Sequence, residues 1–234
     1  MLSNIKREIN GSITFGVEKD TSSLAVLSFL SSSFKSFVSE SKSVGVLNEK
    51  GISHLLCIYL NRKAKKYPFF FQSEYVENIL SGSSPQVDIA IIAEENIIDI
   101  FDKSHSEHNC FFSIEAKRLP TPGHKRHKEY VIGSEAPCGG IERFKKGIHG
   151  ANLKYAALVA YIQKEDSDFW FGEVNKWINE LVDDEFWFKE EKLKWLDASE
   201  KENCGFLTSM HHRQIHGVKA ENINLYHYWL NLTV

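Results

Sequence analysis

Three carboxylates and one lysine, in three separate segments, are the residues of this 234-residue chain that could do chemistry together. Residues 113–119 read SIEAKRL, and alternation along a strand would point Glu115 and Lys117 from the same face, roughly 7 Å apart at their Cα atoms. Asp88 lies in a second β-rich run, where an ionised carboxylate among aliphatic neighbours costs free energy unless it is paired or binds a metal. Glu49 opens an expected helix, close to the buried stripe of that helix.

This set of residues fits poorly in an apolar core, but it fits well around a hard divalent cation. Mg²⁺ takes oxygen ligands, usually one or two carboxylates together with water and phosphate oxygens. A cation held in this way activates water, and a lysine beside it stabilises charge that builds on a phosphate. We therefore expect Mg²⁺ (or Mn²⁺) as the cofactor.

The elements that must position these residues follow from hydrophobic periodicity. Helices are expected over residues 21–43, 49–65, about 140–148 and 168–181, and strands over residues 67–75, 87–93, 110–117, 155–161, 206–214 and 223–232. Leu24 should belong to the apolar face of the first helix, and Leu55 to that of the second. Runs of strands mixed with helices indicate an α/β sandwich around a mixed sheet.

The motif residues resemble those of a known family. PQVD at residues 85–88, followed by EAK at residues 115–117 on the next strand, resembles the PD-(D/E)XK nuclease superfamily, which has the restriction-endonuclease-like fold. That family's core is a helix bearing a glutamate, three strands, a helix and a further strand (αβββαβ), and the expected order matches it from Glu49 to about Gln163. The resemblance implies a central mixed β-sheet flanked by helices, with an extra C-terminal helix and strands.

The resemblance also implies a role for each motif residue. Asp88 and Glu115 would be metal ligands, the Ala116 carbonyl a further ligand and Glu49 an accessory one. Lys117 would position or activate the water and stabilise the transition state. The expected catalytic residues are therefore Lys117, Glu115, Asp88 and Glu49, and the expected product carries a 5′-phosphate.

The spacing of the motif leaves its aspartate open. The 26 residues between Asp88 and Glu115 are more than a tight hairpin requires. They leave room for an inserted loop, or for Asp99 or Asp102 to be the partner of Glu115 instead. We expect a single domain over residues 1–234, with its core at about 44–163, an N-terminal helical segment at 1–43 and a C-terminal elaboration at 164–234.

A basic loop follows directly on the motif lysine. Between Lys117 and Lys128 the chain holds five Lys or Arg residues and two His, although its net charge is −3. Basic residues beside a metal could hold phosphates, and the helix expected after Gly139 would add more. The residues expected to contact nucleic acid, with DNA favoured over RNA, are Arg118, Lys125, Arg126, Lys128, Arg143 and Lys146.

We therefore expect a metal-dependent endonuclease that hydrolyses phosphodiester bonds, and by analogy an effector of a restriction or anti-phage defence system. The alternative is a catalytically inactive nuclease-fold module that binds nucleic acid or a partner subunit. The sequence has no GxxxxGK[ST] or GxGxxG motif, so any ATP-driven function would need a regulatory or ATPase/helicase partner protein. With no run of 18 apolar residues and no signal core, we expect a cytoplasmic protein that does not span a membrane.

Overall fold

The computed structural model describes residues 21–41, 48–77, 84–94, 97–100, 103–106, 109–123, 126–182 and 186–233. The main helices are α1 (Thr21–Glu40), α2 (Glu49–Lys63), α3 (Gly140–Lys145) and α4 (Ser167–Glu180). One sheet is built from β1 (Phe69–Val76), β2 (Gln86–Ala93), β5 (Cys110–Leu119), β6 (Tyr155–Ile162), β7 (Lys194–Asp197), β8 (Cys204–Ile215) and β9 (Val218–Asn231). A separate hairpin is formed by β3 (Ile97–Ile100) and β4 (Lys103–Ser106).

The seven-stranded sheet has the order β1-β2-β5-β6-β9-β8-β7 and is mixed. β1, β2 and β5 pair antiparallel, whereas β5, β6 and β9 pair parallel. The antiparallel strands β7 and β8 complete the other edge. From α2 to β6 the chain therefore runs helix, three strands of this sheet, helix and strand, with the β3–β4 hairpin inserted before β5. This is the expected order for that part of the chain, and the protein is of the α/β class.

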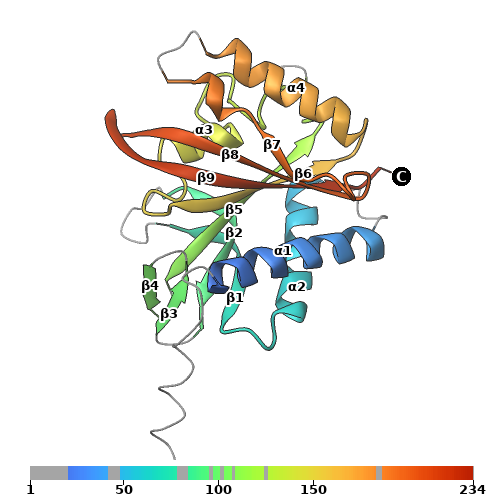
Figure 1. Cartoon of the computed structure of the whole chain (residues 1–234), viewed down its shortest axis with the longest axis vertical. Helices are drawn as coiled ribbons and strands as arrows, with labels where there is room; N and C mark the ends of the chain where they lie inside the picture. The colour runs from blue at the N-terminus through green and yellow to red at the C-terminus, as the bar shows by residue number, and fades with distance from the viewer. Residues whose placement is uncertain are drawn as a thin grey trace, which may run out of the picture.

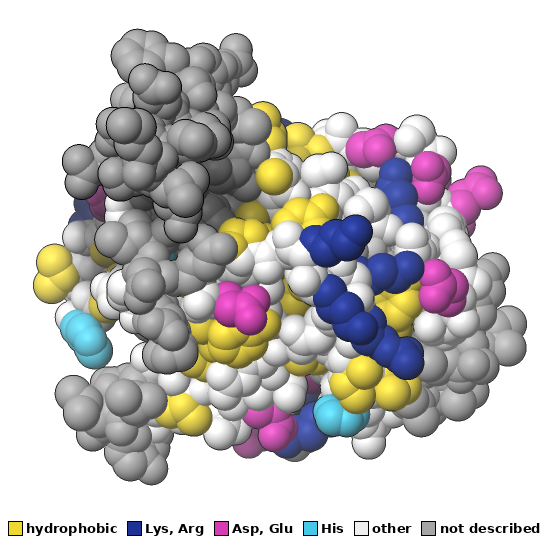
Figure 2. Space-filling model, turned by 90° about the horizontal axis from the view of Figure 1, so that it is seen from below, with side chains coloured by type: hydrophobic (Ala, Val, Ile, Leu, Met, Phe, Trp, Pro, Cys, Tyr) yellow, Lys and Arg dark blue, Asp and Glu magenta, His cyan; other side chains and the backbone are white. Residues whose placement is uncertain are grey.

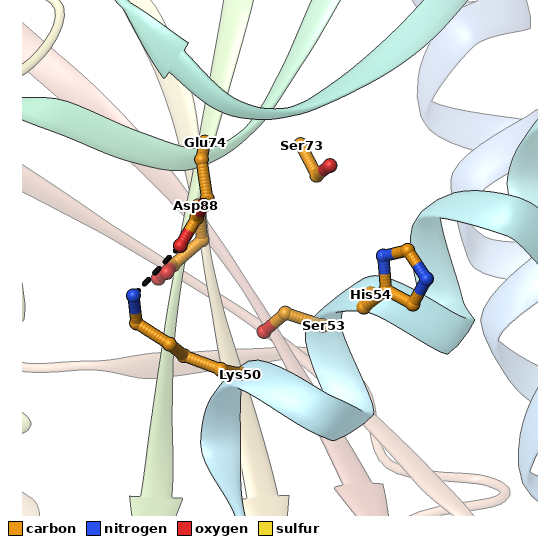
Figure 3. A pocket seen from close by; sticks show the side chains of 6 residues that line it. All are labelled: Lys50, Ser53, His54, Ser73, Glu74 and Asp88. Carbon is orange, nitrogen blue, oxygen red and sulfur yellow. Dashed lines mark hydrogen bonds and ion pairs between the residues drawn. The ribbon is translucent and has the colours of Figure 1, made fainter.

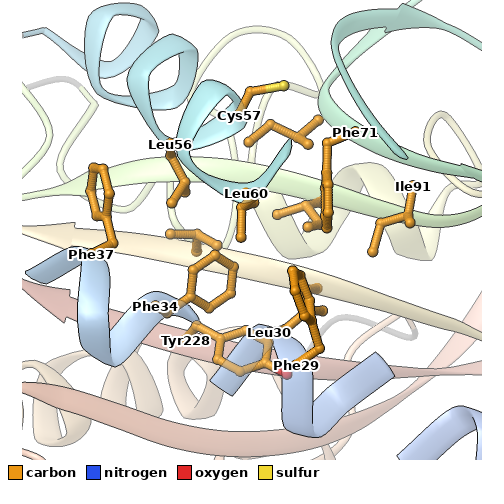
Figure 4. Packing of buried hydrophobic residues seen from close by; sticks show 14 of the residues in the cluster. Phe29, Leu30, Phe34, Phe37, Leu56, Cys57, Leu60, Phe71, Ile91 and Tyr228 are labelled. Atoms are coloured by element: carbon orange, nitrogen blue, oxygen red, sulfur yellow. The ribbon is translucent and has the colours of Figure 1, made fainter. Parts of the chain in front are cut away.

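Two layers of helices cover the sheet, with α1 and α2 on one face and α3 and α4 on the other (Figure 1). On the first face, Phe29, Leu30 and Phe34 of α1 pack with α2 residues and with Tyr228 of β9 (Figure 4). On the second face, apolar residues of α3 and α4 pack against β6 and β9. Side chains of the central strand β5 therefore point into one of two apolar cores. A polar side chain on this strand needs a hydrogen-bond or ion-pair partner there.

The expected helices and strands are present, but several details differ. Leu24 and Leu55, expected on apolar helix faces, are 60% and 37% exposed. The other residues expected on the apolar face of α1, Leu27, Leu30, Phe34 and Phe37, are buried, and Val26 and Phe29 are buried with them. The first two helices end at Glu40 and Lys63, before the expected ends, and β7 and the β3–β4 hairpin were not expected. Strands of four residues are too short to give a clear alternation.

Within the described ranges, no helix has the length and apolar character that are needed to cross a bilayer.

Candidate active site

Asp88 lies where β2 and β5 stop pairing. The antiparallel register between these strands ends at Ile89 and Ile114. Just beyond this pair, Oδ2 of Asp88 accepts a hydrogen bond of 2.7 Å from the backbone N–H of Ala116. The carboxylate therefore fills the gap between two diverging strands and replaces a ladder hydrogen bond.

β1 is distorted on the other side of Asp88. Its register with β2 passes from Ser73–Ile89 to Tyr75–Val87, and Glu74 between these pairs has φ +50°. A left-handed backbone in a non-glycine residue is sparsely populated and is found where surrounding contacts hold it. The distortion places a break in both ladders of β2 at the level of Asp88.

Glu49 reaches the same strand edge from the first turn of α2. Asn48 caps this helix, because its side chain accepts the N–H of Gly51 at 2.8 Å. Oε2 of Glu49 accepts the backbone N–H of Arg118 at 3.0 Å, and Oε1 lies 3.9 Å from Nζ of Lys117. The first turn of α2 therefore places a second carboxylate against β5, two residues along β5 from the N–H that Asp88 accepts.

Glu115 and Lys117 point from one face of β5, as expected from their spacing. Nζ of Lys117 donates to Oε1 of Glu115 at 2.8 Å, and the two side chains are only 6% and 1% exposed. Opposite them on β6 lie Leu158 and Ala160, so this neighbouring strand offers the ion pair no polar side chain. The structure thus brings Glu49, Glu115 and Lys117 into one group, and Asp88 adjoins it through the Ala116 amide.

Arg143 joins this group from α3. Its Nη1 donates to Oε1 of Glu115 at 3.2 Å. α3 can begin this close to the sheet because Gly139 and Gly140 precede Arg143. A Cβ at Gly140 would lie 2.8 Å from Cδ1 of Leu158 on β6, and a Cβ at Gly139 would lie 2.3 Å from the Cα of Ile132 in the preceding loop.

The carboxylates of the group differ in their readiness to ionise. Burial raises the pKa of Asp88 well above its usual value, and the charge of Glu115 raises it further. Burial also raises the pKa of Glu49. At Glu115 burial acts in the same direction, but the nearby Lys117 ammonium and Arg143 guanidinium outweigh it and lower the pKa. Glu115 therefore carries the charge of the group, while Asp88 would gain most from a cation.

Lys117 is held in its charged form. Burial alone would lower its pKa, but the carboxylates of Glu115, Glu49 and Asp88 raise it above the ordinary lysine value. An ammonium in this position can donate hydrogen bonds to a phosphate or to water. It is a poor proton acceptor at neutral pH.

A cavity of about 220 Å³ opens beside Asp88, between α2 and the strands β1 and β2 (Figure 3). Its lining residues are Lys50, Ser53, His54, Ser73, Glu74 and Asp88. Lys50 pairs with Glu74 across it, at 2.8 Å. The cavity gives a small polar molecule or phosphate oxygen a route to Asp88, whereas Glu115 and Lys117 lie deeper.

The donor set suits a hard cation in part. Among the described residues, no three His, Cys, Asp or Glu side chains converge into a ready-made metal cage. Mg²⁺ needs only one or two carboxylates, with water and phosphate completing its shell. Oε2 of Glu115 is buried without a hydrogen-bond partner, and the raised pKa of Asp88 reflects a carboxylate that lacks compensating charge. These two residues fit such a site.

Most of the basic residues that we expected to contact nucleic acid pair with the chain's own carboxylates. Arg126 forms two hydrogen bonds with Glu129, Lys128 pairs with Glu180 and Lys146 with Glu142. Arg118 is different, because no described side chain forms an ion pair with it and its Nε is buried without a partner. Of this group, Arg118 has the guanidinium most available to a phosphate.

Three other residues were candidates for the site: Lys125, Asp99 and Asp102. Lys125 and Asp102 lie outside the described residues. Asp99 belongs to β3, which pairs only with β4 in the separate hairpin, and its side chain is not described. Asp88 contacts β5 through its carboxylate.

Two residues next to the group were not anticipated from the sequence. His149 is fully buried, with Nε2 at 3.0 Å from Nη1 of Arg143 and 3.4 Å from Oε2 of Glu115. Its Nδ1 lies 3.0 Å from Oε2 of Glu77. Neither residue belongs to a recognisable motif, and only the position of His149 soon after GIERFKKG could have suggested it.

A basic patch was also missed. Seen from below, Lys and Arg side chains gather on one part of the surface (Figure 2). The end of α2 and the turn after it supply four exposed cations, Arg62, Lys63, Lys65 and Lys66. At 1.5 Å per residue, the 15 residues of α2 place these cations roughly 20 Å from Glu49.

Comparison of the chain with protein-family models, with curated proteins and with solved structures gave no match.

Proposed function

We propose that the protein is a metal-dependent nuclease of the PD-(D/E)XK type with a restriction-endonuclease-like core, cutting phosphodiester bonds in nucleic acid, with DNA favoured over RNA. The helix–three strands–helix–strand order around β5 supports this proposal. The observation that carries it is the convergence on β5 of Asp88, Glu115, Lys117 and Glu49 from three separate elements. A neutral amide oxygen could accept the same backbone N–H groups of β5, so the capping of this strand does not by itself account for buried carboxylates here.

In this proposal each residue has one task. Asp88 and Glu115 would hold Mg²⁺ or Mn²⁺, with Glu49 as an accessory ligand. The Ala116 carbonyl would assist, because a strand residue directs its N–H and C=O to the same side and the N–H already faces Asp88. When bound, the cation would activate water and offset charge on the phosphate.

The chain's own cations would do the rest. Lys117, held as an ammonium, would donate to a phosphate oxygen and orient the attacking water. Arg118, whose guanidinium has no carboxylate partner among the described residues, would hold a neighbouring phosphate. The proton of the water would go to a group other than Lys117, because its pKa is raised rather than lowered.

The test is cleavage of supercoiled plasmid and of labelled single strands of DNA and RNA, with Mg²⁺, Mn²⁺ or EDTA. Glu115→Gln and Lys117→Met keep the size of each side chain and remove its charge. We expect metal-dependent cutting by the wild type and a loss of at least about 100-fold in both variants. Lys176→Met is the matched control, because it removes a lysine paired with Glu173 on α4, outside the group. Full cutting by both site variants would refute the assignment.

A second function, a non-catalytic module of the same fold that binds nucleic acid or a partner subunit, is favoured by one observation. Lys117 is buried and already pairs with Glu115, as it would in a site that has closed. For such a module, the wild type would bind DNA equally with and without Mg²⁺ and would cut nothing. Metal-dependent cutting by purified protein excludes this second function.

A further inference from the structure

A buried histidine links the candidate site to a glutamate at the end of β1. Oε1 of Glu77 accepts the backbone N–H of Gly150 at 2.8 Å and the hydroxyl of Ser113 at 3.1 Å. Its other oxygen, Oε2, lies 3.0 Å from Nδ1 of His149. Three donors therefore fix the Glu77 carboxylate, and one of them is the imidazole of a fully buried residue.

The partners of His149 determine where its proton lies. The Glu77 carboxylate can only accept, so Nδ1 must carry a hydrogen. Nη1 of Arg143, 3.0 Å from Nε2, can only donate, so Nε2 must be unprotonated and accept. His149 is therefore neutral, in the Nδ1–H tautomer, and hydrogen bonds run from Arg143 through His149 to Glu77.

This direction of hydrogen bonding decides how Glu115 is used. One N–H of Nη1 of Arg143 goes to His149, and the other goes to Oε1 of Glu115, which also accepts from Lys117. Oε2 of Glu115 faces the unprotonated Nε2 of His149 at 3.4 Å, where no hydrogen bond can form. Both donors therefore converge on one oxygen, and the other is left without a donor.

We propose that Glu77 and His149 are a positioning pair, which holds Arg143 on Oε1 of Glu115 and keeps Oε2 free to bind a divalent cation. This inference rests on the proposed function, because it assigns Glu115 to the cation. Neither residue touches the substrate in this account. They act through Arg143, in the way that outer-shell hydrogen bonds orient metal ligands and set their affinity.

Glu77→Gln tests the pair without changing its shape. The N–H of Gly150 and the hydroxyl of Ser113 lie against Oε1, so the amide oxygen of the new glutamine should take that place. Its NH₂ group then faces Nδ1 of His149, which must become an acceptor and shift its proton to Nε2. The new Nε2–H can no longer accept the hydrogen bond from Arg143. It donates to Oε2 of Glu115 instead, so that this oxygen is no longer free to bind a cation.

Two measurements report the change. Long-range ¹H–¹⁵N spectra of the imidazoles give the tautomer, with the His149 signals among the ten histidines identified from a His149→Gln sample. Calorimetric titration with Mg²⁺ and with Mn²⁺ gives the affinity of the free protein. We expect the Nδ1–H tautomer in the wild type, the Nε2–H tautomer in Glu77→Gln, and metal affinity lowered about 10- to 100-fold.

Ser113→Ala is the matched control, because it removes a different hydrogen bond to Glu77 and leaves the contact with His149. Its tautomer and metal affinity should equal those of the wild type. An Nε2–H or doubly protonated His149 in the wild type would overturn the proposal, and so would a tautomer switch that leaves metal affinity intact. If the wild type binds no metal, the proposed function fails, and the tautomer switch alone then decides whether Glu77 and His149 hold Arg143.

Discussion

The carboxylate of Asp88 accepts the backbone N–H of Ala116 at a distance of 2.7 Å. This hydrogen bond lies just past the end of the β2–β5 ladder, where a neighbouring strand would otherwise supply the acceptor. Glu49 does the same for the N–H of Arg118, two residues further along β5. Backbone N–H groups are costly to bury without a partner. The two carboxylates thus complete the sheet edge and supply charge to the candidate site at the same time.

Asp88→Asn separates these two roles. The amide oxygen can still accept the N–H of Ala116, while the charge that burial and Glu115 oppose is removed. We expect the free energy of unfolding to rise by about 1 kcal/mol, because functional sites are commonly less stable than they could be, and the melting temperature to rise by roughly 2–4 °C. Mg²⁺ should raise the melting temperature of the wild type and leave that of the variant unchanged.

Asp88→Ala is the control for this prediction, since alanine has no oxygen to accept the Ala116 N–H. It should lower stability by about 1–3 kcal/mol, the cost of a buried donor left unsatisfied. Thermal and urea unfolding of the three proteins at neutral pH give the comparison. Equal destabilisation by both substitutions would mean that the charge of Asp88 stabilises the fold, and would contradict the prediction.

The fold was largely predictable, because its long elements carry clear periodicity. Runs rich in apolar and β-branched residues placed β2, β5 and β6 within one or two residues of their ends, and α4 buries the apolar residues Trp170, Val174, Trp177 and Ile178 on one face. Pairing of short or distorted strands was not predictable. The strands of the β3–β4 hairpin have only four residues each, and β4 is wholly polar. The left-handed backbone of Glu74 has no signal in the local sequence.

The candidate site was predictable where its residues lie close in sequence or share a strand face. Glu115 and Lys117 meet because they are two residues apart on β5. Glu77 and His149 were missed because they are 72 positions apart and meet only through tertiary packing. Arg126, Lys128 and Lys146 were expected to contact nucleic acid, but each forms an ion pair with a glutamate of the chain. A count of charges in the sequence does not show which charges pair.

A second buried ion pair provides a prediction about stability away from the site. Nζ of Lys145 donates to both oxygens of Glu191, both side chains are fully buried, and the aromatic rings of Phe186 and Trp187 lie around the ammonium. Lys145→Met leaves the carboxylate without its cation and should cost about 3–5 kcal/mol. Lys128→Met breaks the partly exposed pair with Glu180 and should cost about 1 kcal/mol or less. Urea unfolding measures both losses of stability, and equal losses in Lys145→Met and Lys128→Met would contradict the prediction.

The same pair predicts how stability depends on pH. Burial alone would raise the pKa of Glu191, but contacts with His211 and Lys145 lower it to about 2. Because the folded-state pKa lies below the unfolded value, the contribution is present above about pH 4.5 and is lost as pH falls toward 2. Glu191→Gln should be less stable than the wild type at pH 6, and the difference should shrink below pH 4.5. A difference that is constant from pH 6 to pH 3 would contradict the lowered pKa.

The basic patch at the end of α2 makes a prediction about nucleic-acid binding. No described carboxylate forms an ion pair with Lys65 or Lys66, and both are exposed. If they contact phosphates of a duplex bound at the candidate site, Lys65→Gln/Lys66→Gln should reduce the slope of log affinity against log salt by about 1.8, since each phosphate contact contributes about 0.9. Fluorescence anisotropy with a labelled duplex in EDTA measures this slope without cleavage. Lys194→Gln/Lys219→Gln, which removes exposed lysines from β7 and β9, should leave the slope unchanged. Equal slopes for all three proteins would place the duplex away from α2.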